Sequence, residues 1–196
     1  MKFFRDPYSN KSIFFGRNAG VIYSLDKAES GQLHIDNLKS VITFDDVEIQ
    51  IEDISKLFGA EKYQMRDSNS KKVVGIISNV AAATTFFDSQ IPYRLDANLT
   101  INGLQYSFEN ISSPKMIFPF KRNRFKFYEF LLKQANKSDY VKYSLTMRLP
   151  FWTTAGFYRQ HAFEGSINST TPDRIIIFLG MFLIQKSFTA RFESIE

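Results

Sequence analysis

Alternation of apolar and polar residues with a period of two recurs along the chain and predicts strands. The clearest example is Ala97–Phe108, which has Asn102-Gly103 at its centre. An Asn-Gly pair favours the two-residue turn of a hairpin, and counting outward from it fixes the register. The apolar residues then face each other in three pairs: Ile101 with Leu104, Leu99 with Tyr106, and Ala97 with Phe108. Because pattern and turn agree, an antiparallel hairpin is predicted here.

Further strands are predicted on both sides of this hairpin. Val47–Ile51 and Val141–Arg148 alternate clearly, and in the second segment one face carries Val141, Tyr143, Leu145 and Met147. The weaker candidates are Ser12–Phe15, Val21–Leu25, Gln32–Ile35, Tyr63–Arg66, Lys72–Ser78, Met116–Phe120 and Tyr158–Phe163. Many short strands separated by turn residues are typical of a barrel or a sandwich.

Helices are predicted in three places. Ile51–Phe58 is a short candidate that Gly59 would end. Arg124–Gln134 is a better one, because an apolar stripe lies opposite charged residues when the segment is helical. The residues of that stripe are Tyr128, Leu131, Leu132 and Ala135, opposite Lys126, Glu129 and Lys133.

The strongest helix is predicted near residues 172–185. Thr171 is the expected N-cap, with Pro172 at the first helical position and Asp173 in the first turn. The body, Ile175–Ile184, is apolar on every face, so it must be surrounded by protein. Ten helical residues rise about 15 Å, half of a hydrocarbon core, which argues against a membrane span. Many strands and one such helix suggest that the strands wrap around it.

Composition supports a mainly β protein of one domain, residues 1–196. Aromatic residues make up 16% of the chain, and such residues favour strands. The absence of cysteine excludes disulfides, thiolate metal sites and cysteine nucleophiles. The chain turns polar soon after Met1, with no signal-peptide core, so an intracellular, cytoplasmic protein is expected.

Positive charge is concentrated in residues 111–148, which we call the basic segment. It holds 9 Lys and Arg against 2 Asp and Glu, whereas the whole chain has a net charge of +5. Within it, bases are interleaved with rings, and the basic-aromatic patch is defined as Lys115, Lys121, Arg122, Arg124 and Lys126. Basic groups attract an anionic surface, and rings can insert once the protein has docked.

Three interpretations of the basic-aromatic patch remain open. It is a lipid-headgroup site on an anionic membrane, a nucleic-acid site, or a solvated turn whose rings belong to the core. Nucleic acid is disfavoured because no known recognition motif is present. An acidic protein surface is the alternative partner to lipid.

The C-terminal stretch Asp173–Gln185, following a run of strands, resembles the tubby-like superfamily. This group includes tubby C-terminal domains, LURP-one-related proteins, phospholipid scramblases and small bacterial relatives, and the chain is most similar to the last kind. The resemblance implies a closed antiparallel β-barrel around a hydrophobic C-terminal helix, and a binding module, lipid-binding or membrane-associated, more than an enzyme. Scramblases carry an acidic stretch before the final helix, but residues 165–171 here have no carboxylate. Calcium-driven scrambling is therefore not expected.

Other candidate sites are weak. The acidic residues Asp45, Asp46, Glu48, Glu52 and Asp53 lack the order of a calcium loop, and a solvated sheet face is the simpler interpretation. His34 and His161 have no partner at metal-ligand spacing. Gly16–Gly20 is expected to be a turn, and Trp152 is expected to pack rather than to anchor a membrane.

The expected function is a non-enzymatic binding module without a cofactor, peripheral on anionic lipid. The alternative is a protein-interaction or regulatory module of the same fold.

Overall fold

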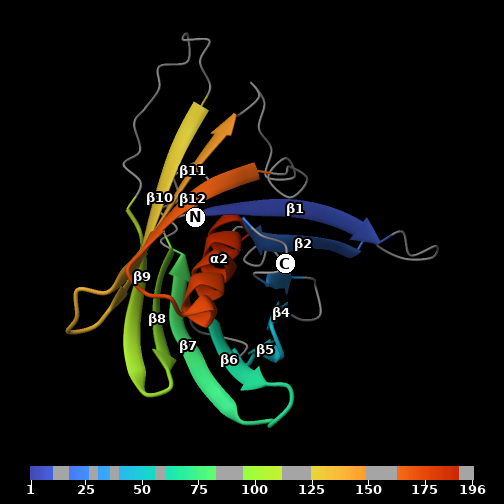
Figure 1. The fold of residues 1–196 in the computed structure, drawn as a ribbon, viewed down its shortest axis with the longest axis vertical. Helices are drawn as coiled ribbons and strands as arrows, with labels where there is room; N and C mark the ends of the chain where they lie inside the picture. Colours follow the sequence, from blue (N-terminus) through green and yellow to red (C-terminus); the bar gives the residue numbers. More distant parts are fainter. Residues whose placement is uncertain are drawn as a thin grey trace.

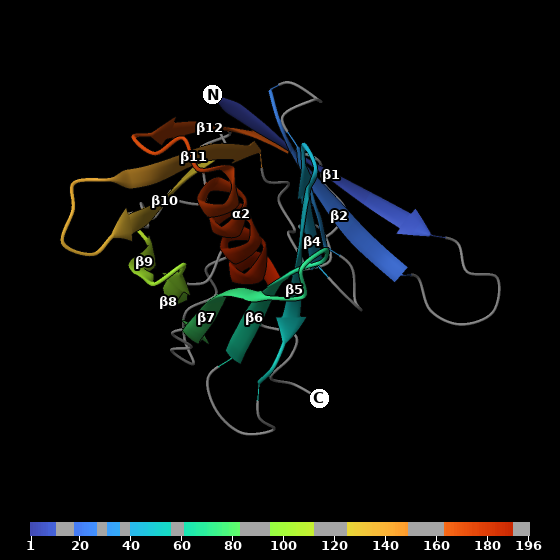
Figure 2. The same cartoon turned by 60° about the horizontal axis from the view of Figure 1, so that its bottom comes forward.

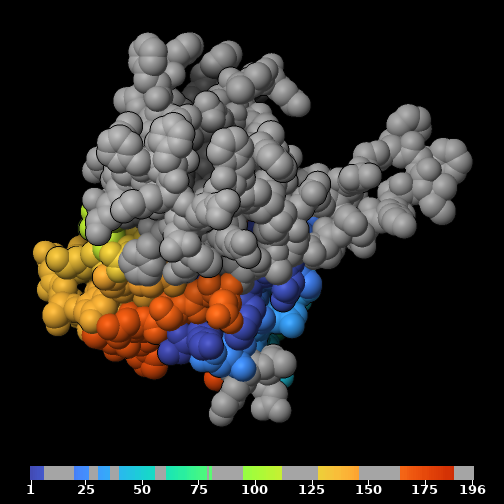
Figure 3. All heavy atoms as spheres, turned by 90° about the horizontal axis from the view of Figure 1, so that it is seen from above, coloured from blue at the N-terminus to red at the C-terminus, as the bar shows by residue number. Residues whose placement is uncertain are grey.

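The computed structural model describes residues 1–10, 18–26, 31–35, 40–55, 61–82, 95–111, 125–148 and 163–189. Strands form a closed antiparallel barrel, and each strand pairs with its neighbours in the sequence. The first and last strands close the wall, with Lys2 opposite Ser166 and Arg5 opposite Phe163. The strands are β1 Lys2–Asn10, β2 Asn18–Leu25, β3 Gln32–Ile35, β4 Ser40–Phe44, β5 Val47–Asp53, β6 Glu61–Asp67, β7 Val73–Ala82, β8 Leu95–Ile101, β9 Leu104–Asn110, β10 Phe125–Gln134, β11 Tyr140–Arg148 and β12 Phe163–Ser169. Seen from above, β10 and β11, then β12, β1 and β2 follow one another along the described wall (Figure 3).

One helix, α2 Arg174–Thr189, runs through the barrel and is surrounded by strands in two views (Figures 1 and 2). Every residue from Ile176 to Ile184 is buried, and Phe178, Leu179 and Met181 are 0% exposed. The predicted mainly β fold, a closed antiparallel barrel around a hydrophobic C-terminal helix, is thus confirmed. Among the described residues, no helix combines the length and the apolar character needed to cross a bilayer.

The inner faces of the strands supply the rest of the core. The predicted hairpin has the expected register, with Ile101 opposite Leu104 and Ala97 opposite Phe108. Asn102 and Gly103 both have positive φ angles, 49° and 80°, as its two-residue turn requires. Along β8 buried and exposed residues alternate strictly, so one face of the strand packs on the interior.

Segment 125–134 is a strand, so the predicted helix Arg124–Gln134 is wrong. Tyr128, Phe130 and Leu132 alternate with half-buried residues and point into the barrel. β10 pairs with β11 along Phe125–Lys133 and with β9 along Phe130–Gln134, and these ladders satisfy the backbone polar groups that take part in them. The apolar spacing fits both periods, and long-range pairing decides between them.

Other corrections are smaller. The predicted helix Ile51–Phe58 begins as strand, because residues 51–53 belong to β5, and residues 56–60 lie outside the described part. Strands β1, β4 and most of β12 were not predicted. The expected strands Ser12–Phe15 and Met116–Phe120 and most of Tyr158–Phe163 lie outside the described residues. The same holds for the first part of the turn expected at Gly16–Gly20, but its last three residues are strand β2.

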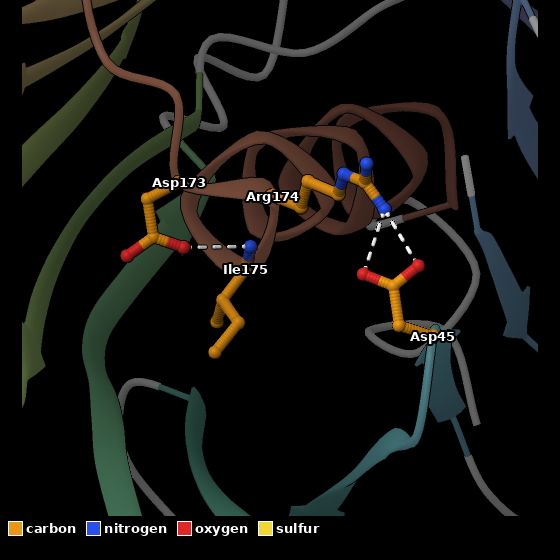
Figure 4. A network of polar contacts seen from close by, with 4 residues as sticks. All are labelled: Asp45, Asp173, Arg174 and Ile175. Carbon is orange, nitrogen blue, oxygen red and sulfur yellow. Dashed lines mark hydrogen bonds and ion pairs between the residues drawn. The ribbon is translucent and has the colours of Figure 1, made fainter.

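The start of α2 also differs from the prediction. The helix begins at Arg174, and Asp173 is its N-cap because its Oδ1 accepts a hydrogen bond from the Ile175 backbone N–H at 2.9 Å (Figure 4). Thr171 lies two residues before this N-cap, and its Oγ1 accepts a hydrogen bond from the Asp173 N–H at 3.3 Å. Pro172 therefore precedes the helix instead of opening it.

The two ends of the barrel are connected differently. At one end, which we call the turn end, the described links are the short turns 45–46, 68–70, 102–103 and 135–138. Helix α2 also enters the barrel at this end, directly after β12. At the other end, the connection end, strands are linked through residues 11–17, 36–39, 56–60, 83–94, 112–124 and 149–162. Most of the sequence outside the secondary structure is therefore attached at the connection end.

Candidate functional site

Most of the predicted basic-aromatic patch lies in the stretch of chain that joins β9 to β10, two strands that meet at the connection end. Lys115, Lys121, Arg122 and Arg124 lie outside the described residues, and the strands that flank them, β9 and β10, end and begin at this end. Lys126 is the second residue of β10 and pairs with Met147 in the register.

The register adds a further base to this region. Arg148 is the last residue of β11 and stands opposite Phe125, next to Arg124 in the chain. Arg148 lies in the basic segment but is not one of the five residues of the predicted basic-aromatic patch. The signal that could have identified Arg148 was an antiparallel pairing of Val141–Arg148 with residues 125–134. The prediction of a helix over Arg124–Gln134 excluded that pairing.

The acidic and basic strands lie on opposite sides of the barrel. In the strand order around the barrel, β4 is the sixth strand from β10, and β5 is the sixth strand from β11. The two pairs flank α2 on opposite sides in Figure 2. Residues 40–55 carry five carboxylates and no Lys or Arg, whereas residues 125–148 carry five bases and two carboxylates. The described wall is therefore electrostatically asymmetric.

On the acidic side, the charges face outward and are partly paired. Ile49 and Ile51 are buried, while Glu48, Gln50 and Glu52 alternate with them. Glu52 forms an ion pair of 3.7 Å with Arg66, and Glu48 Oε1 accepts a hydrogen bond from Ser68 Oγ at 2.7 Å. Within the described chain no three His, Cys, Asp or Glu residues gather in a way that would hold a metal ion.

A buried polar cluster joins the helix to the first two strands. Arg5 is 1% exposed, and its Nε donates to Gln185 Oε1 at 2.9 Å. The Tyr23 hydroxyl donates to the same oxygen at 2.9 Å. Burial raises the pKa of Tyr23 to about 12, although the nearby Arg5 guanidinium opposes this shift. The phenol is thus protonated at neutral pH and acts as a donor rather than a base.

The next helical residue makes a second polar contact. Lys186 Nζ lies 4.9 Å from the centroid of the Tyr63 ring and 5.9 Å from that of Phe182. The Tyr63 hydroxyl in turn donates to the Glu61 carboxylate. Sequence reasoning missed both clusters, and the visible signal was the polar pair Gln185-Lys186 that ends the apolar run.

These clusters position the helix and offer no evident catalytic chemistry. Arg5, Tyr23 and Gln185 provide donors around one amide oxygen, with no nucleophile beside a base. Of the histidines, His34 Nε2 lies 3.0 Å from Gln32 Oε1 on β3, and His161 lies outside the described residues. Trp152 also lies outside them. Comparison with protein-family models, curated protein sequences and solved structures finds no match to this chain.

Proposed function

We propose that the protein is a non-enzymatic binding module that associates peripherally with anionic membrane lipid, at the cytoplasmic face. The observation that carries this proposal is the charge asymmetry of the barrel. The basic segment follows β9 and contains β10 and β11, while β4, β5 and their connecting turn, which together carry five carboxylates, lie across the barrel. A protein with charge separated in this way turns its basic side toward an anionic surface.

The magnitude is adequate for reversible binding. Near an anionic membrane each Lys or Arg contributes about 1 kcal/mol, so three or four bases that approach together suffice for peripheral attachment. Residues 112–124 supply four bases and no carboxylate. Helix α2 fills the interior, which favours a ligand that binds on the outer surface over a substrate enclosed by the barrel.

We also propose that the chain is a divergent member of the tubby-like superfamily. What supports this is the architecture, because a closed antiparallel barrel around a hydrophobic C-terminal helix is what the resemblance implies.

Vesicle sedimentation tests the lipid proposal. The test variant replaces Lys121, Arg122 and Arg124 with Glu, and leaves Lys126 unchanged because it belongs to strand β10 of the barrel wall. A control variant replaces Lys62, Lys71 and Lys72, which are exposed on β6 and the following turn, with Glu. Both variants change the net charge from +5 to −1, since three bases become three acids.

Wild type and control should sediment with vesicles that contain phosphatidylserine but not with pure phosphatidylcholine, and salt should weaken the binding. The test variant should lose most of the binding. Equal losses in both variants would show that only net charge matters. No binding by the wild type would refute the lipid role and favour the protein-interaction alternative, and preferential binding to an oligonucleotide would favour nucleic acid.

A further inference from the structure

A cavity of about 410 Å³ lies at the turn end, where the chain passes from β12 into α2. Its floor is apolar and comes from three elements of the fold. Leu25 ends β2, Ile167 belongs to β12, and Ile177 lies in the first turns of α2. These side chains are 4%, 5% and 2% exposed, so the floor belongs to the packed interior.

Most polar groups of the rim are already occupied. Ser169 Oγ donates to the Thr171 carbonyl at 2.8 Å, and the Thr171 N–H donates back to Ser169 Oγ at 3.2 Å. The charged group among the lining side chains is Arg174, whose side chain is 38% exposed. The Met1 ammonium also belongs to the lining, and it donates to the Ile167 carbonyl at 3.3 Å. The cavity therefore combines an apolar floor with cationic groups at its edge, of which Arg174 is the side chain.

Arg174 is held in position on one side only. Its Nη1 donates to both carboxylate oxygens of Asp45, at 3.2 and 3.1 Å (Figure 4). Its guanidinium also lies 6.0 Å from the Phe44 ring centroid. Within the described part of the chain, Nε and Nη2 have no hydrogen-bond partner. These two nitrogens form the edge of a guanidinium that is suited to a second carboxylate.

We propose that this cavity binds a small carboxylate with an apolar body, such as a medium-chain fatty acid. The apolar body would pack on Leu25, Ile167 and Ile177, and the carboxylate would accept hydrogen bonds from Arg174 Nε and Nη2. Small-molecule sites are mostly apolar with a few fixed polar groups, and their volumes of about 300–1,000 Å³ include this one. Because Asp45 and Phe44 already orient the guanidinium, little ordering is needed on binding.

Titration with octanoate, followed by amide chemical shifts, tests the site on the full chain. Octan-1-ol is the uncharged probe of equal length. The test variant is Arg174→Gln, and the control is Lys142→Gln. Lys142 also has a 38% exposed side chain in an ion pair, with Glu129, but it lies on the outer wall far along the barrel order from Asp45.

Octanoate should shift the amides of Leu25, Ile167 and Ile177 and bind at least about tenfold more tightly than octan-1-ol, because the charge-assisted hydrogen bonds are lost with the alcohol. Arg174→Gln should weaken octanoate about tenfold, and Lys142→Gln should not. Equal affinity for both probes, unchanged binding by Arg174→Gln, or shifts confined to other regions would overturn the proposal. The experiment contains no vesicles and probes the end opposite residues 112–124, so its failure leaves the proposed lipid role intact.

Discussion

Replacing Gly180 with alanine tests how closely the helix packs on the barrel wall. A Cβ at Gly180 would lie 2.1 Å from the Tyr143 hydroxyl oxygen, 2.3 Å from Cζ and 2.5 Å from Cε2. Tyr143 is 0% exposed, and its hydroxyl donates to the Ile177 carbonyl at 2.8 Å. The ring therefore has no free space to move into, and displacing it breaks a buried hydrogen bond.

Three contributions set the magnitude. Overpacking of a core costs about 1–3 kcal/mol. Leaving a buried carbonyl or hydroxyl unsatisfied costs a further 1–3 kcal/mol or so. Alanine recovers about 1 kcal/mol because it favours the helix over glycine. We therefore expect Gly180→Ala to lower the free energy of unfolding by about 3 kcal/mol, which for a chain of this size lowers Tm by about 6–12 °C.

Urea and thermal unfolding monitored by circular dichroism measure this loss, and two backgrounds identify its cause. Tyr143→Phe retains the ring carbons that a Cβ would strike, so it should not rescue Gly180→Ala. Tyr143→Leu removes them, so the added cost of Gly180→Ala in that background should fall below about 1 kcal/mol. If Gly180→Ala were neutral or stabilising in the wild type, the close contact between α2 and β11 would be refuted.

Three further predictions concern the helix and its polar contacts. Leu179→Asp would bury an unpaired carboxylate in a fully enclosed helix, so no cooperative unfolding transition should be detected by circular dichroism. Asp173→Ala should cost about 1 kcal/mol in urea unfolding and Thr171→Ala clearly less, because Asp173 caps the helix; the reverse order would restore Thr171 as the cap. Burial raises the pKa of Tyr23 from 10.0 to about 12, so the folded state holds this proton more tightly, and about 2–3 kcal/mol present below pH 10 should be lost as pH rises to 12. Tyr23→Phe should flatten that part of the stability profile in urea titrations at successive pH values, and an unchanged slope would contradict the assignment.

Local sequence patterns were sufficient to predict an element when the residues that determine it all lie within that element. The hairpin 97–108 was predicted with its register because turn and alternation lie within twelve residues, and the terminal helix because it is apolar on every side. β10 was predicted wrongly, since its apolar spacing fits both a helix and a strand. Only its pairing with β9 and β11 excludes the helix, and that pairing depends on residues outside the segment itself.

The strands that could not be predicted from the sequence contain residues whose roles depend on contacts with other parts of the fold. β12 contains Gly165, and a Cβ there would come within 2.3 Å of the Phe3 ring, so the strand is adapted to a partner from the start of the chain. β1 contains Arg5, a residue type that is usually exposed, but in the fold Arg5 is buried beside Gln185 and Tyr23.

The candidate site shows the same division. The basic segment could be counted from the sequence, but its position across the barrel from the acidic strands follows only from the strand order. Arg174, which lies within the stretch Asp173–Gln185, gains its orientation from Asp45, a residue 129 positions away.

The position of α2 after all the described strands of the barrel affects how the protein is made. All twelve strands leave the ribosome before the helix that fills them, and β1 cannot pair with β12 until residues 163–169 have emerged. Strands joined in sequence order can form hairpins early, but their inner faces have no interior to pack against until the last element appears. The nascent wall therefore exposes apolar side chains and a free β1 edge throughout synthesis, which makes it prone to association. Completion of the barrel therefore waits for α2, and nascent chains arrested before residue 174 are expected to depend on chaperones for protection.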